Sequence, residues 1–148
     1  MPRATMAFVN ADEIARQMAI GTPSASALDV AAGRAMLTAI DRLVGQRSDF
    51  MLETTPATRT YARKIPQWRQ SGYSIALIYL RLPSAETSIE RVRKRVLAGG
   101  HSLPESVIRR RFDKSARYLE AVYKPLVDEW YVYDSLEGAF ALAEAWDD

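Results

Sequence analysis

The alternation of short apolar runs with longer segments of helical periodicity is the feature that most constrains this fold. The strands expected from these runs lie at residues 7–9, 49–55, 73–82 and 130–133, and helix signals fill the stretches between them. Strands that alternate with helices of about 10–15 residues form parallel βαβ units. We therefore predict a layered α/β fold with a mostly parallel sheet flanked by helices. The apolar tail at 139–146 has no period that separates helix from strand.

Local signals predict several helices and their ends. Ser84 is expected to cap a helix that ends at the glycine pair 99–100. Between the first two apolar runs, the spacing of Val30, Met36 and Ile40 predicts a helix with one buried face.

The bulk composition fits one domain spanning residues 1–148. The chain is 48% hydrophobic and has no cysteine, which leaves out disulfides and thiolate metal sites. A net charge of +2 balances 20 basic against 18 acidic residues, so nucleic acid is not an expected partner. No run approaches the roughly 20 apolar residues of a membrane span, and no apolar signal core follows Met1. We expect a cytoplasmic protein with no membrane partner.

Acidic residues stand at the carboxyl ends of two predicted strands. Asp12 follows the first run, and Glu53 ends the second, with Thr54 and Thr55 behind it. The carboxyl ends of parallel strands meet at one edge of a sheet, where open α/β folds bind ligands. A carboxylate there can accept the proton of a hydroxyl that attacks a phosphate. The alternative is that Asp12 caps the following helix. The unbroken apolar run before Glu53 also predicts a strand buried on both faces.

Basic residues crowd two later helices, and the segment 99–111 connects them as a candidate lid. Arginine forms forked contacts with phosphate, so two or three of these residues are expected to bind one. The alternative is a pair of solvated helices held by i,i+4 ion pairs. The basic residues are Arg91, Arg93, Lys94, Arg95, Arg109, Arg110, Arg111, Lys114 and Arg117.

Several segments, in order along 8–135, resemble the zeta-toxin-like P-loop kinases. They begin with Phe-Val-Asn-Ala-Asp-Glu-Ile-Ala at 8–15 and Glu53-Thr54-Thr55 with Arg59. The later matching segments are 73–83, Arg91-Val92 through Gly99-Gly100-His101 and Pro104, Ile108-Arg-Arg-Arg-Phe112, Tyr123-x-Pro-Leu-Val-Asp128 and Val132-Tyr133-Asp134-Ser135.

The resemblance implies a P-loop-kinase-like fold and an ATP- and Mg²⁺-dependent kinase. Its acceptor would be a sugar hydroxyl of a compound like UDP-N-acetylglucosamine. Asp12 would accept the hydroxyl proton, and Glu53, Thr55 and Arg59 would bind the acceptor. An antitoxin protein is the partner that the family suggests. The candidates for nucleotide phosphates are Arg91, Arg95, His101, Arg109, Arg110 and Arg111.

The printed sequence departs from the family in its first segment. The family begins with a strand, a G-x-x-G-x-G-K-[ST] loop and a helix, and only Met1 to Ala7 stand before Phe8 here. Such a loop supplies backbone N–H groups, a lysine and a Mg²⁺-binding hydroxyl. We therefore expect this chain to be inactive alone and its sheet to carry an unpaired edge, through which it would form a homodimer. The alternatives are a non-catalytic module that binds nucleotide or UDP-sugar, and an RNA- or partner-binding protein that uses the helix at 109–117.

Overall fold

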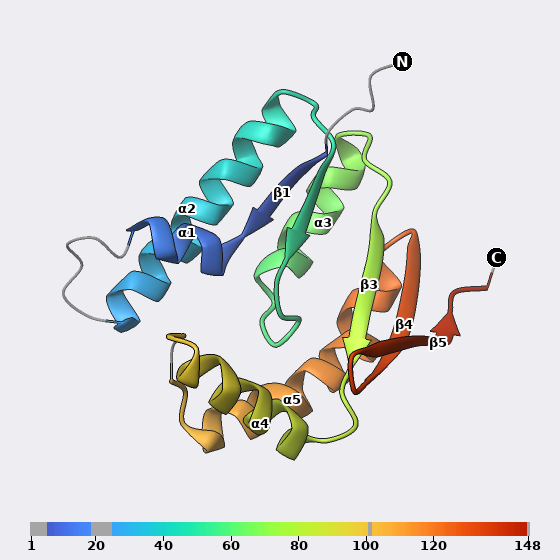
Figure 1. The fold of residues 1–148 in the computed structure, drawn as a ribbon. Helices are drawn as coiled ribbons and strands as arrows, with labels where there is room; N and C mark the ends of the chain where they lie inside the picture. Colours follow the sequence, from blue (N-terminus) through green and yellow to red (C-terminus); the bar gives the residue numbers. More distant parts are fainter. Residues whose placement is uncertain (1–5, 19–24, 101, 148) are drawn as a thin grey trace. The chain divides into compact units, whose positions relative to one another are not determined.

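The computed structural model describes residues 6–18, 25–100 and 102–147 (Figure 1). The chain divides into two compact units, Met1–Thr54 and Thr55–Asp148. The described strands form two sheets, one in each unit, with the orders β1-β2 and β3-β4-β5. The α/β class predicted from the sequence is confirmed.

The first unit is a parallel strand pair joined by two helices. Its elements are β1 (Ala7–Asn10), α1 (Ala11–Met18), α2 (Ala25–Gly45) and β2 (Phe50–Glu53). β1 and β2 run parallel, in a register that joins Ala7 to Phe50 and Asn10 to Glu53. Both predicted strands thus end together, with Asn10 beside Glu53.

One stripe of α2 forms the core of the first unit. Ala32, Met36 and Ile40 are each at most 2% exposed and recur every four residues, which places them on one helix face. Val30 was predicted to lie on the buried face, but it is 58% exposed, because the buried face of α2 is the one that carries Ala32, Met36 and Ile40. Ala15 of α1 packs against Ala32, so the two helices share this core.

The prediction that the strand before Glu53 is buried on both faces is wrong. Met51 is 54% exposed, and its register partner Phe8 is 58% exposed. Val9 on the opposite face is 6% exposed, and α2 contacts β1. Within its unit the strand pair therefore has one packed face and one open face.

The second unit holds a three-stranded sheet and three α-helices. Its elements are α3 (Thr60–Gln70), β3 (Ala76–Arg81), α4 (Ala85–Leu97), α5 (Glu105–Tyr118), the π-helical turn η1 (Leu119–Tyr123), the 3₁₀ turn η2 (Lys124–Leu126), β4 (Glu129–Leu136) and β5 (Ala139–Ala145). β3 and β4 are parallel, as predicted, and β5 is antiparallel to β4. The apolar tail whose type the sequence left open is this last strand.

α4 and α5 form a helical hairpin with its own small core. Ile89 and Val92 of α4 pack with Ile108 of α5. The predicted cap is confirmed, because the Ser84 hydroxyl accepts from the backbone N–H of Thr87 at 3.3 Å. The predicted glycine stop is confirmed as well: α4 ends at Leu97, and Gly99 takes a φ of 93°. No helix of the described residues is long and apolar enough to cross a bilayer.

Candidate functional site

Asn10 hydrogen-bonds to both acidic residues of the first unit's candidate site, Glu53 and Asp12. Its side-chain amide donates to Oε2 of Glu53 at 3.0 Å. Its carbonyl Oδ1 accepts from the backbone N–H of Asp12 at 2.8 Å. Asn10 therefore holds the Glu53 side chain and fixes the start of α1 at the same time.

Asp12 lies exposed in the first turn of α1. The alternative that Asp12 caps this helix is wrong, because the capping oxygen belongs to Asn10. The positive end of the helix dipole attracts acidic side chains at this position. None of the described side chains pairs with the Asp12 carboxylate, so it is free to meet a ligand.

Asn10 was not among the residues predicted for the site. It is the only asparagine of the chain and the last residue of β1. Its importance comes from the β1–β2 register, which pairs it with Glu53 across 43 residues of sequence. The sequence contains the residue type but not the register, so this contact required the structure.

Thr55 opens the second unit and contacts α5. Its Oγ1 lies 3.3 Å from the Oγ of Ser115, and the same Oγ1 accepts from the backbone N–H of Ala57 at 3.3 Å. Ser115 is only 7% exposed, so this hydroxyl pair lies at the edge of the packed helix. Ser115 is a second residue that the sequence-based prediction missed.

Arg59 precedes α3 and stacks on an aromatic ring of α5. Its guanidinium carbon lies 5.2 Å from the centroid of the Tyr118 ring. Lys114 approaches the same ring, with its Nζ 5.3 Å from the centroid. Thr55 and Arg59, both predicted to bind the acceptor, thus each contact a residue of α5.

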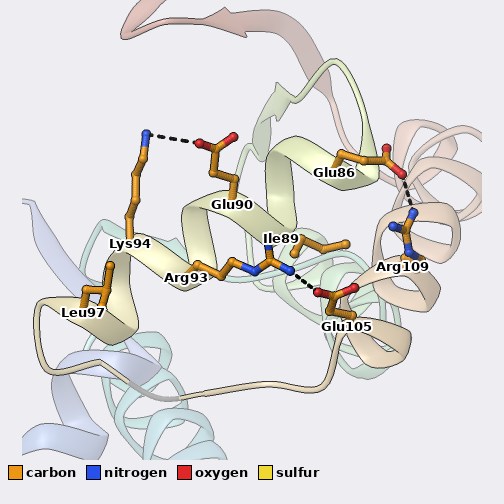
Figure 2. A pocket seen from close by; sticks show the side chains of 8 residues that line it. All are labelled: Glu86, Ile89, Glu90, Arg93, Lys94, Leu97, Glu105 and Arg109. Atoms are coloured by element: carbon orange, nitrogen blue, oxygen red, sulfur yellow. Dashed lines mark hydrogen bonds and ion pairs between the residues drawn. The ribbon is translucent and has the colours of Figure 1, made fainter.

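The groove between α4 and α5 is a cavity of about 490 Å³. Ion pairs between charged side chains line it, as Figure 2 shows. Arg93 binds Glu105, and Lys94 lies 3.8 Å from Glu90. The remaining pair joins Arg109 to Glu86.

Arg109 is thus engaged within the protein. Its hydrogen bond holds the pKa of the Glu86 carboxyl below the usual value, and the same bond raises the pKa of Arg109. Both side chains are exposed, so the pair is a surface contact of small energy.

The other predicted phosphate-binding residues differ in their surroundings. Arg91 donates to the Oγ of buried Ser135 at 2.8 Å, which ties α4 to β4. Arg95, Arg110 and Arg111 are exposed and have no ion-pair partner among the described residues. His101 lies outside the described residues. The predicted lid, 99–111, contains the connector and the first seven residues of α5, and its motion stays a prediction.

The donor groups of the two units differ in the ligands that they suit. Within the described residues no three His, Cys, Asp or Glu side chains gather as a metal site. Magnesium usually takes one or two carboxylates and completes its shell with water and substrate phosphates. Asp12 and Glu53 supply carboxylates of that kind, whereas the unpaired arginines of α4 and α5 suit phosphate oxygens.

Comparison with known proteins identifies the family. The family model described as "Zeta toxin" matches residues 8–135. An uncharacterized protein of Haemophilus influenzae is 24% identical over 109 residues, covering 74% of this chain and 76% of that protein. The ends of β1 and β2, the α4–α5 hairpin and all of β4 but its last residue fall inside the matched range. The chain therefore belongs to the zeta toxin family and has the P-loop-kinase-like α/β fold of that family.

Proposed function

We propose that this chain carries the acceptor site and the arginine-bearing helices of an ATP-dependent small-molecule kinase. The acceptor would be a sugar hydroxyl of a nucleotide sugar such as UDP-N-acetylglucosamine. Family membership supports the kinase-like, nucleotide-binding class. The observation that carries the proposal is the Asn10 side chain, which holds Glu53 and positions Asp12 at the same strand end.

Asp12 is the proposed proton acceptor. As the acceptor oxygen bonds to the γ-phosphorus, its proton passes to the Asp12 carboxylate, and the bond between that phosphorus and the departing diphosphate breaks. Asp12 suits this role because its carboxylate is exposed and unpaired within the described chain. Its backbone N–H is fixed by Asn10 at 2.8 Å, so the base sits on an ordered helix start.

Glu53 and Thr55 are the proposed ligands of the acceptor's hydroxyl groups. One oxygen of Glu53 accepts from Asn10, which orients the carboxylate while leaving the other oxygen for a ligand. The Thr55 hydroxyl is oriented by Ser115 and by the N–H of Ala57. Because these hydrogen bonds already fix the two side chains, ligand binding costs little of their conformational entropy.

Phosphate contacts from this chain would come from side-chain cations. The printed sequence has no G-x-x-x-x-G-K-[ST] loop. Arg95, Arg110 and Arg111 are the exposed arginines without an ion-pair partner in the described chain, and they suit the spread negative charge of a transferring phosphoryl group.

An acceptor titration tests the proposal. UDP-N-acetylglucosamine is titrated into the wild-type chain by calorimetry, and the measurement is repeated with Glu53→Ala and with the control Glu13→Ala. Glu13 is an exposed acid of α1 whose partners among the described residues, Arg16 and Gln17, lie on the same helix. We expect about tenfold weaker binding for Glu53→Ala and no change for Glu13→Ala. Equal affinities of the wild type and Glu53→Ala would contradict the assignment.

A transfer assay separates the kinase from a binding module. Phosphorylated acceptor is measured by mass spectrometry with ATP and Mg²⁺ for the wild type, Asp12→Asn and Glu13→Gln. Product that Asp12→Asn abolishes and Glu13→Gln preserves would show that this chain catalyses the transfer, and it would contradict the expectation that the chain is inactive alone. Tight acceptor binding without product would instead favour the non-catalytic nucleotide-sugar-binding module.

A further inference from the structure

Two cations share one aromatic ring in the second unit. Arg59 and Lys114 lie 5.2 and 5.3 Å from the centroid of Tyr118. Arg59 comes from the start of α3, whereas Lys114 and Tyr118 are one turn apart on α5. The ring attracts both charges through its electron-rich face, and it brings together two like charges that repel each other.

No carboxylate of the described residues forms an ion pair with either cation. Among the described residues neither Arg59 nor Lys114 has a carboxylate within ion-pair distance. Elsewhere on the same hairpin, Arg93, Lys94 and Arg109 each have a glutamate partner. Lys114 is moreover half-buried, where an unpaired ammonium is less well solvated. The charge around Tyr118 is therefore left for an anion from outside the chain.

Further polar side chains of α5 lie near Tyr118 along the helix. Arg111, Ser115 and Tyr118 follow at helix spacings of four and three residues, which makes them neighbours on α5. The Ser115 hydroxyl lies 3.3 Å from the Thr55 hydroxyl, so this part of the unit also carries hydrogen-bond donors. Hydroxyl and cationic donors in one cluster match the several oxygens of a phosphate group.

We propose that Arg59 and Lys114, aligned by the Tyr118 ring, form a clamp for a diphosphate group. Lys114 and Arg59 contact the anion, and Tyr118 is a positioning residue. The inference deepens the proposed function by adding Lys114 and Tyr118 to the ligand site. Inorganic pyrophosphate tests the clamp separately from the proposed function, because its binding to Arg59 and Lys114 does not require the roles proposed for Glu53 and Asp12.

Calorimetry with pyrophosphate at low ionic strength tests the clamp. The variant Lys114→Gln is compared with Lys94→Gln, which removes the same charge from the paired, exposed Lys94 of α4. We expect pyrophosphate affinity to fall about tenfold in Lys114→Gln and to stay within twofold of wild type in Lys94→Gln. Absence of saturable binding by the wild type, or equal losses in the two variants, overturns the proposal.

Ring variants test the positioning role of Tyr118. Tyr118→Phe keeps the ring and should retain pyrophosphate affinity within about twofold, whereas Tyr118→Leu should lose about fivefold. Circular dichroism establishes that each variant is folded, and Arg59→Gln should give a loss of pyrophosphate affinity that is independent of Lys114. Equal affinities of the Phe and Leu variants refute the positioning role. UDP and ADP then identify the source of the diphosphate, because the nucleotide whose affinity depends more strongly on Lys114 is the one that the clamp holds.

Discussion

Asn10 is the residue whose replacement gives the sharpest test of the site geometry. Asn10→Ala removes the cap of α1 and the contact to Glu53 together. Loss of an asparagine cap costs about 1 kcal/mol, and loss of the hydrogen bond to Glu53 costs about 0.5–1.5 kcal/mol. The expected destabilisation is therefore roughly 2 kcal/mol, or about 4–8 °C in Tm for a chain of this size.

Asn10→Ser separates the two contributions. Serine is a good capping residue but is too short to span the distance to Glu53, so it should restore about half of the lost stability. A double-mutant cycle with Glu53→Ala should give a coupling energy of about 0.5–1 kcal/mol between the two side chains. Urea unfolding followed by circular dichroism measures these free energies.

The side-chain amide of Asn10 also gives a direct signal. Because this is the only asparagine of the chain, selective ¹⁵N-asparagine labelling yields one side-chain NH₂ pair in an NMR spectrum. That pair should shift in Glu53→Ala and remain in place in Glu13→Ala. An unchanged NH₂ signal in Glu53→Ala, or equal stabilities of the alanine and serine variants, would refute the bridging role of Asn10.

Three further predictions concern packing, charge and backbone. Ile40→Ala, at a residue with no exposed surface, should cost about 2–5 kcal/mol in urea unfolding. The pKa of Glu86 lies below its unfolded value, so its pairing stabilises the fold above the unfolded pKa and is lost as pH falls through the folded one. A ¹³C NMR titration of Glu86 should shift to higher pH in Arg109→Gln. Gly100→Ala places a Cβ 2.8 Å from a backbone carbonyl oxygen of α4 and should cost about 1–3 kcal/mol, whereas Gly33→Ala, with open space around it, should stabilise by about 0.5–1 kcal/mol in thermal unfolding.

The parts of the fold that sequence predicted well are those governed by local chemistry. β1 ends at Asn10, and Ser84 caps α4, because a strand end and a cap depend on a few adjacent residues. The type of β5 was not predictable, since its many alanines suit helix as well as strand. Pairing with β4 decides that it is a strand, which is a tertiary effect.

The exposure of the apolar strand faces was harder to predict than the strands themselves. An unbroken apolar run indicates burial on both faces only when helices cover both. Phe8 and Met51 share a face that no described element of their unit packs against, so both remain more than half exposed. The pattern thus predicted a strand at 49–55, which the structure shows at Phe50–Glu53, but it predicted the burial of that strand incorrectly.

The basic helices show why sequence alone could not choose the phosphate-binding residues. Within the sequence the arginines of α4 and α5 look alike, and the net charge of +2 hides any local excess. Two ion pairs of the groove, Arg93–Glu105 and Arg109–Glu86, join α4 to α5 and therefore depend on the hairpin geometry. Only the Lys94–Glu90 pair, at i,i+4 within α4, follows from sequence spacing.

The pairing is also uneven around α5. Arg109 is neutralised by Glu86, whereas Arg111 and Lys114 have no acid partner in the described chain. Since Arg59 and Lys114 both approach the Tyr118 ring, positive charge accumulates on this part of α5. An anion that approaches α5 is therefore attracted more strongly to Tyr118 than to the neutralised groove, although the groove contains as many cations.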